Sequence, residues 1–366
     1  MTDEECGRKS YGFGKAKTYS RLEHDPFSSF LRIGSVLPPF LIRLFHRPGV
    51  GDGKSTFPPG EGFRRCRASV SNCNLKLVNN MNGIVIIDKP QGWTSQDVTA
   101  RLRRVFNTRR IGHGGTLDPM ATGVLPVFVG RATRGVEFFE HAQKAYEATL
   151  RLGIATDTED ITGTVLEKRD VHISETEFSG ILNRFRGKIM QIPPMYSALK
   201  VNGQKLCDLA RKGREVERQP REIEIFELTL LEFAGDTARL RVRCSKGTYI
   251  RTLCKDIGEA LGCGGCMESL RRIQAGEYTI AEAVPLQELL DSENPEPYLR
   301  QVDTMFRNYP AVTLTANQEK RCRNGNSFSV KLEDGTYRAY AGDGEFLMLA
   351  KVENGVMSTI KSFWEV

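Results

Sequence analysis

The stretch Gly112–Gly123 combines a flexible backbone with a carboxylate that could do chemistry. Glycines at positions 112, 114 and 115 let the backbone bend closely around a bound group. Asp118 stands before Pro119, a position that favours extended backbone, so its carboxylate could point into a cleft. The alternatives are a turn aspartate that caps its own loop and, for His113, an ordinary loop histidine.

Three further segments carry residue types that could take part in chemistry or binding, and the last of them suits RNA. Lys246–Thr252 spans a predicted strand-to-helix junction, where free backbone N–H groups accompany Tyr249 and Arg251. The segment Lys144–Tyr146 opens a predicted strand, and Ile192–Lys200 mixes aromatic with basic residues. Each segment also has a plainer interpretation. In Lys246–Thr252, Tyr249 would lie in the core and Arg251 on the surface. Tyr146 would be an aromatic residue at a strand edge, and Ile192–Lys200 would be a solvated loop.

Hydrophobic periodicity predicts the elements that must position these residues. Alternation of apolar residues predicts strands, and apolar residues three or four apart predict helices. Thr94 or Ser95 is the predicted cap of the first helix, whose buried face carries Val98, Leu102 and Val105. The predicted strands are Ile84–Ile87, Val124–Val129, Tyr146–Leu152 and Ala238–Cys244, and the later predicted helices are Thr133–Gln143 and Thr252–Leu261.

Positive charge is predicted to gather in two places. Residues 190–221 are rich in Lys and Arg and contain Pro193-Pro194, which indicates a long basic loop or hairpin insertion. Arg239, Arg241 and Arg243 alternate with the apolar residues of their strand and therefore share its other face. Both places are candidate RNA surfaces.

The last sixty residues change pattern. Asp334-Gly335, Asp343-Gly344 and Asn354-Gly355 are three strong hairpin-turn signals at short intervals. They predict a small all-β domain after Pro310.

The charge balance excludes a strongly basic folded domain. The 366 residues have a net charge of +7, but residues 1–80 hold 13 Lys and Arg against 7 Asp and Glu. The remaining residues carry 39 basic against 38 acidic side chains, so any nucleic-acid surface must be a local patch. The nine cysteines have no framework spacing, which favours reduced thiols, and the single Cys263–Cys266 pair lacks zinc-site partners.

Residues 1–80 are unlike the rest of the chain. They show no sustained periodicity, so we expect a disordered N-terminal extension, and translation that really starts at Met81 is the alternative. The acidic opening argues against a secretory signal or a transit peptide, and no apolar run is long enough for a membrane span. Gly49–Thr56 imitates a phosphate-binding loop, but its first glycine is misplaced and no strand precedes it.

Several of these segments resemble, in order and spacing, the TruB family of tRNA pseudouridine synthases. The matching segments are Asp88–Ser95, Gly112–Pro119, Lys144–Tyr146, Ile192–Lys200, Lys246–Arg251 and Leu270–Arg272. The resemblance is close from about residue 83 to 280 and weak beyond. It implies an α+β pseudouridine synthase fold with a mixed, mainly antiparallel sheet, followed by a small C-terminal all-β PUA-like domain.

The resemblance also implies roles for single residues. Asp118 corresponds to the essential catalytic aspartate, Tyr146 to the tyrosine that stacks on the target base, and Arg251 to the arginine that pairs with the aspartate. Whether the aspartate attacks C1′, attacks C6 or removes a sugar proton stays open. The remaining expected RNA-binding residues are His113, Tyr249, Leu270, Lys89, Tyr196 and Lys200.

The implied function is isomerisation of uridine to pseudouridine at position 55 in the TΨC loop of tRNA, with the base flipped into a pocket. The expected domains are 81–305, catalytic with an RNA-closing insertion, and 306–366, PUA-like. We expect no cofactor and no metal, tRNA as partner, no obligatory protein partner, a monomer, and a cytoplasmic location. The rivals are a tRNA-binding or tRNA-folding module without catalysis and a synthase of messenger or ribosomal RNA.

Overall fold

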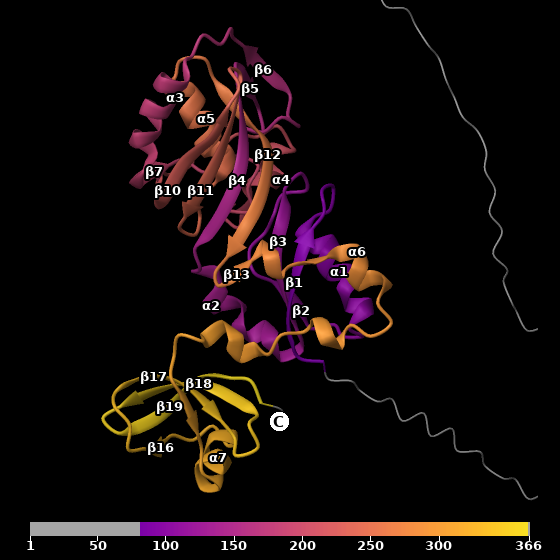
Figure 1. Ribbon diagram of the computed structural model, residues 1–366, viewed down its shortest axis with the longest axis vertical. Coiled ribbons are helices and arrows are strands. Elements are labelled where there is room, and N and C mark those ends of the chain that lie inside the picture. The colour runs from indigo at the N-terminus through magenta and orange to yellow at the C-terminus, as the bar shows by residue number, and fades with distance from the viewer. Residues whose placement is uncertain (1–80, 365–366) are drawn as a thin grey trace, which may run out of the picture. The chain divides into compact units, whose positions relative to one another are not determined.

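A ten-stranded mixed sheet dominates the part of the chain that the structure describes, residues 81–364 of a computed structural model (Figure 1). Eight strands follow the order β14-β1-β3-β12-β4-β11-β10-β7, while β13 pairs with β12 and β2 with β3. Only the β1–β14 and β3–β12 pairs of this sheet are parallel. Residues 1–80 lie outside the described residues. The predicted disorder of this extension, the alternative that translation starts at Met81, and the interpretation of Gly49–Thr56 therefore stay predictions.

The strands of this sheet are β1 (Gly83–Lys89), β2 (Ile111–His113), β3 (Thr122–Val129), β4 (Lys144–Leu152), β7 (Gly187–Gln191), β10 (Arg221–Phe233), β11 (Thr237–Cys244), β12 (Gly265–Ala275), β13 (Tyr278–Thr279) and β14 (Val284–Pro285). Two short hairpins stand outside it, formed by β5 (Ile154–Thr156) with β6 (Val165–Lys168) and by β8 (Lys200–Val201) with β9 (Gln204–Lys205).

Strict alternation places β4 and β11 side by side over the main core. Tyr146, Ala148, Leu150 and Leu152 of β4 are buried, as the period of two predicts. So are the alternate residues of β11 from Ala238 to Cys244. In the antiparallel register Tyr146 lies opposite Val242, which brings two segments nearly a hundred residues apart into one hydrophobic layer.

The first helix begins where the sequence predicts. Thr94 is the N-cap of α1 (Ser95–Val105): its hydroxyl accepts from the Asp97 N–H, and the Asp97 carboxylate accepts from the Thr94 N–H. The other α-helices are α2 (Val136–Glu140), α3 (Glu175–Leu182), α4 (Leu206–Ala210), α5 (Ile250–Ala260), α6 (Leu286–Asp291) and α7 (Ala316–Arg323). The 3-10 helices are η1 (Gly130–Gly135), η2 (Asn183–Phe185), η3 (Ile280–Glu282), η4 (Glu296–Tyr298) and η5 (Val302–Phe306).

The predicted helix over Thr133–Gln143 was wrong in extent. Its first residues belong to the 3-10 helix η1, and the α-helical part is only the five residues of α2. Gly130 and Gly135 bracket η1, and glycine disfavours a continuous α-helix because it loses the most conformational freedom on folding.

The predicted basic insertion contains more structure than a loop. After Gln191 the chain forms the β8–β9 hairpin and α4 before it rejoins the sheet at β10. Met195, Leu206 and Leu209 give this segment a small hydrophobic cluster of its own. The basic side chains Lys200, Lys205, Arg211 and Lys212 are exposed around it.

A separate five-stranded sheet lies in the C-terminal part, with the order β15-β17-β18-β19-β16. Its strands are β15 (Ala311–Thr313), β16 (Phe328–Ser329), β17 (Gly335–Tyr340), β18 (Phe346–Glu353) and β19 (Val356–Ser362). Asp343-Gly344 and Asn354-Gly355 join paired strands as predicted. Asp334-Gly335 does not, because β16 pairs with β19 rather than with β17.

The all-β description of this part missed the helix α7. Thr315 caps it, and Gln318 reaches back to the Thr315 N–H, so the capping box was present in the sequence. No helix among residues 81–364 is long and apolar enough to cross a membrane.

Candidate active site

The structure joins two of the predicted catalytic residues in an ion pair. Nε of Arg251, at the start of α5, lies 3.0 Å from Oδ2 of Asp118. The Arg251 side chain is 7% exposed and the Asp118 side chain 37%, so the carboxylate is the open member of the pair. Among the described residues, Oδ1 of Asp118 has no hydrogen-bond partner. One carboxylate oxygen is therefore held in an ion pair while the other has no partner, which suits a nucleophile or a general base.

The loop that carries Asp118 is fixed from both sides. Ser95, the first residue of α1, accepts from the Leu117 N–H at 2.8 Å and donates to the Leu117 carbonyl at 3.2 Å. The Gly92 N–H donates to the Pro119 carbonyl at 2.8 Å. Because the residues on either side of Asp118 are both tied down, its carboxylate is held in one place before any substrate arrives.

Lys89 acts on the same loop from the end of β1. Its ammonium donates to the carbonyls of Trp93 at 2.6 Å, Pro90 at 2.9 Å and Pro119 at 3.4 Å. Burial lowers the pKa of Lys89 to about 8, with Asp118 raising it and Arg272 lowering it. Lys89 is fully buried beneath the loop, so it supports Asp118 rather than offering a surface for RNA.

Arg251 also binds the two segments on its other side. It donates to the Thr158 carbonyl at 3.1 Å and to the Tyr196 carbonyl at 2.8 Å. Its Nη1 lies 3.9 Å from Oδ2 of Asp160. Tyr196 belongs to the insertion, so one guanidinium links the insertion, the loop around Thr158 and the Asp118 carboxylate.

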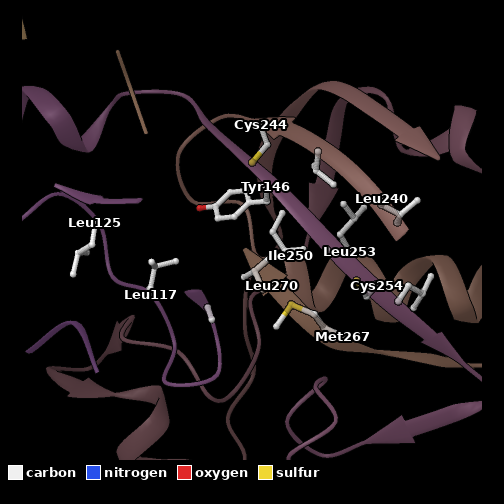
Figure 2. Close-up of a cluster of buried hydrophobic side chains, with 14 of the residues drawn as sticks. Leu117, Leu125, Tyr146, Leu240, Cys244, Ile250, Leu253, Cys254, Met267 and Leu270 are labelled. Atoms are coloured by element: carbon white, nitrogen blue, oxygen red, sulfur yellow. The ribbon is translucent and has the colours of Figure 1, made fainter. Parts of the chain in front are cut away.

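Tyr146 belongs to the main hydrophobic cluster, and its hydroxyl points away from Ile250 and Leu253, toward the side where Leu117 and Leu125 lie (Figure 2). Burial raises the pKa of Tyr146, and the neighbouring Arg272 guanidinium opposes that effect. Arg272 is 1% exposed and donates to the carbonyls of Val124 at 2.7 Å and Gly115 at 3.1 Å. A buried cation therefore stands between Tyr146 and the glycine-rich loop.

Tyr249 and Leu270 are placed beside these groups. The side-chain amide of Gln191 accepts from the Tyr249 N–H at 2.8 Å and donates to the Tyr249 carbonyl at 3.1 Å. Leu270 is 8% exposed and belongs to the same cluster as Tyr146. Burial raises the pKa of the Tyr249 phenol.

His113 and Lys200 differ from this group. His113 lies in β2, and burial together with Arg272 lowers its pKa, so the imidazole is neutral at pH 7. Lys200 is exposed in β8 of the insertion, and no contact joins it to Asp118 among the described residues. Among residues 81–364, no cluster of three or more His, Cys, Asp or Glu side chains is placed to hold a metal ion.

Sequence reasoning gave no supporting role to Ser95, Gln191 or Arg272. Ser95 and Arg272 lie in segments that resemble the family, and Arg272 had a further signal, because Arg271 and Arg272 are successive residues of a strand and must face opposite sides. Arg271 turns outward to Asp88 at 2.8 Å, which leaves Arg272 in the interior.

Two family models match consecutive parts of the chain. The model of TruB family pseudouridylate synthase (N terminal domain) matches residues 103–250, and that of the tRNA pseudouridylate synthase B C-terminal domain matches 251–303. A tRNA pseudouridine synthase B of Clostridium kluyveri is 42% identical over 289 residues, which are 77% of this chain and all of that relative. The chain belongs to the TruB family.

Another relative and a solved structure extend this result. A tRNA pseudouridine synthase B of Francisella philomiragia is 44% identical over 289 residues, covering 78% of this chain and 95% of that relative. A chain in the crystal structure of a Cbf5-Nop10-Gar1 complex has a TM-score of 0.60 at 25% identity, with 78% of this chain and 85% of that chain covered. The expected pseudouridine synthase fold, with its mixed sheet, is confirmed.

Proposed function

We propose that this protein converts uridine to pseudouridine at position 55 in the TΨC loop of tRNA, with Asp118 as the catalytic carboxylate. The observation that carries the proposal is the Asp118–Arg251 pair, in which a fixed carboxylate keeps one oxygen free. TruB relatives named tRNA pseudouridine synthase B support tRNA as the substrate.

The reaction needs groups of the kind found around Asp118. The N1–C1′ bond of uridine breaks, the detached base turns, and C5 joins C1′, so the product is an isomer and no electrons are transferred. The step needs a carboxylate at the sugar or base, a surface against which the loose ring stays oriented, and a group that accepts the C5 proton. Asp118 serves as the first, and the ring of Tyr146 with the apolar side chain of Leu270 serves as the second.

Tyr146 is also suited to the proton transfer. Burial raises the pKa of its phenol, and the Arg272 guanidinium beside it opposes that rise, so Arg272 stabilises negative charge that develops on the oxygen during the transfer. A uridine stacked within an RNA loop cannot reach these groups, so it flips out of the loop, and contact with Tyr146 offsets roughly 1–3 kcal/mol of the lost stacking.

The insertion and the C-terminal sheet complete the proposal. The insertion, held at Tyr196 by Arg251, closes over the flipped base, with Lys200 among the basic side chains that face RNA phosphates. The PUA-like C-terminal domain contacts the tRNA stem. We also propose a cytoplasmic monomer without an obligatory protein partner, which light scattering on the purified chain alone and with tRNA would test.

Replacing Asp118→Asn tests the central claim. The amide is no nucleophile or base, so pseudouridine formation should be abolished. Affinity for tRNA should stay within about an order of magnitude, because phosphate contacts dominate it. Asp236→Asn is the matched control, since that exposed carboxylate pairs with Arg151 away from the site, and it should leave activity unchanged.

The substrate is tested separately. Pseudouridine mapping in RNA from cells lacking the gene should show loss at position 55 of tRNA. Loss confined to messenger or ribosomal RNA would favour the rival substrate, and full modification by Asp118→Asn would remove Asp118 from catalysis.

A further inference from the structure

A pocket opens beside the loop that holds Asp118. Its volume is about 460 Å³, and its lining residues are Gly92, Trp93, Asp97, Ala100, Arg101 and Arg104. Pockets of this size accept a small ligand or a single nucleotide unit. The roles argued above for the active site use none of its side chains.

The lining combines an aromatic ring with two guanidinium groups. The Arg101 guanidinium carbon lies 5.9 Å from the centroid of the Trp93 ring. Trp93 is half-buried and packs against the main core, so the ring is anchored while part of it lines the pocket. An anchored aromatic beside arginine is the arrangement on which a nucleic-acid base stacks.

The positive charge of this pocket is not neutralised within the protein. Arg101 and Arg104 are exposed, and neither has an ion-pair partner among residues 81–364. Asp97 is one α-helical turn from Arg101, but its carboxylate Oδ2 accepts from the N–H and hydroxyl of Thr94 in the helix cap. Two guanidinium groups therefore remain for a phosphate.

The pocket and the catalytic loop are held together by hydrogen bonds. Gly92, in the pocket wall, donates to the carbonyl of Pro119, the residue after Asp118. Lys89 bonds to the carbonyls of both Trp93 and Pro119. These bonds fix the pocket wall relative to Asp118, so the nucleotides that flank a uridine at Asp118 are the candidates to occupy the pocket.

We propose that the pocket of Trp93, Arg101 and Arg104 binds one nucleotide of the RNA substrate other than the uridine that is modified. The base lies against Trp93, and the phosphate lies between the two guanidinium groups. The inference rests on the proposed function in taking the substrate to be RNA, and it adds a contact that fixes the register of the strand at Asp118.

Tryptophan fluorescence tests the contact directly. The sequence has only two tryptophans, Trp93 and Trp364, so Trp364→Phe in the full chain leaves Trp93 as the single reporter. Unmodified tRNA should quench it, and Arg101→Gln/Arg104→Gln in the same background should weaken the quenching. Unchanged fluorescence while filter retention shows tRNA bound would overturn the proposal. Quenching by free UMP at an equal nucleotide concentration, without quenching by tRNA, would assign the pocket to a free nucleotide and also overturn it.

Steady-state kinetics give an independent test. Trp93→Leu and, separately, Arg101→Gln/Arg104→Gln should each raise KM for tRNA about tenfold, because base stacking and phosphate contacts act on binding. Arg239→Gln/Arg241→Gln is the matched control, since those arginines are already paired with glutamates, and its KM should not change. KM values equal to wild type in both pocket variants would contradict the proposal.

The two proposals fail in different ways. If the wild-type chain forms no pseudouridine in tRNA, the proposed function fails, and the fluorescence of Trp93 still decides whether RNA occupies the pocket. If the wild-type chain is active and the pocket variants match it, only the pocket proposal fails.

Discussion

Two sets of arginines have opposite surroundings. Arg251 and Arg272 are buried, and their guanidinium groups contact carbonyl oxygens and, for Arg251, the Asp118 carboxylate. Arg239, Arg241 and Arg243 are between 41% and 47% exposed on β11. They face the glutamates of the neighbouring strands: Arg241 lies 2.8 Å from Glu147 of β4, Arg239 lies 3.3 Å from Glu232 and Arg243 lies 3.8 Å from Glu227, both on β10.

The difference corrects one expectation from the sequence. The β11 arginines were predicted to form a positive RNA surface, but cross-strand glutamates neutralise them. An arginine becomes available to a ligand only when no carboxylate of the fold already faces it. Periodicity within one strand could not reveal this, because the glutamates belong to β4 and β10.

The largest effect is expected from Arg251→Lys. A lysine keeps the charge but cannot hold Asp118 and the carbonyls of Thr158 and Tyr196 together, because its single ammonium lacks the planar fork. We expect kcat to fall by roughly 100-fold or more with a small change in KM, as for loss of one preorganised donor. Single-turnover rates at saturating tRNA measure this. A rate within tenfold of wild type would show that charge alone suffices and would weaken the distinction between buried and exposed arginines.

Arg272→Met is the next most damaging change. It leaves the buried carbonyls of Val124 and Gly115 without their donor, so the free energy of unfolding should fall by about 2 kcal/mol. It also removes the cation beside Tyr146, so the pKa of that phenol should rise further and kcat should fall. Arg271→Met is the control, because its partly exposed pair with Asp88 should contribute about 1 kcal/mol or less. Denaturant titration compares the free energies of unfolding of the two variants. The pH–rate profile shows whether the pKa of Tyr146 rises in Arg272→Met and not in Arg271→Met.

How much of the site could be predicted depended on whether a residue's partners lie near it or far from it in the sequence. Asp118, Arg251 and Tyr146 were recognised because each lies in a segment with a distinctive sequence. Ser95 and Gln191 were not, because their roles depend on backbone N–H and carbonyl groups of segments 22 and 58 residues away. The main strands followed from apolar alternation, whereas the length of α2 and the structure of the insertion depended on local packing.

Lys89 offers a test through pH. Its pKa is about 8 in the folded protein, against an ordinary value of 10.5, so the unfolded chain binds more protons between pH 8 and 10.5. The contribution of Lys89 to the free energy of unfolding should therefore rise with pH across that window and be flat below it. The difference in unfolding free energy between wild type and Lys89→Met, taken at pH 7 and 9.5, isolates this contribution. If wild type becomes less stable relative to Lys89→Met at pH 9.5 than at pH 7, the lowered pKa of Lys89 is contradicted.

The insertion should show how unpaired surface charges behave. Changing Lys200, Lys205, Arg211 and Lys212 together to glutamine should flatten the salt dependence of tRNA binding by a slope of about 2, because these side chains are exposed. Arg211 should contribute least, since Asp208 lies 3.5 Å from it. The choice of target uridine should not change, because backbone contacts carry no sequence information directly. Equal slopes in the wild type and the fourfold variant would mean that these side chains are merely solvated.

The smallest effect is expected from the β11 arginines. Glutamine at positions 239, 241 and 243 removes three positive charges, nearly as many as the insertion variant, yet the salt slope should stay that of the wild type. The free energy of unfolding should fall by about 1 kcal/mol or less, because these ion pairs are exposed. Glu147, Glu227 and Glu232 are left unpaired, so a companion variant with glutamine at all six positions separates lost attraction from new repulsion. If the triple variant loses slope and the sixfold variant recovers it, repulsion by the glutamates is the cause. If both lose slope equally, the arginines bind phosphate despite their partners, and the availability of an arginine cannot be judged from its ion pairs alone.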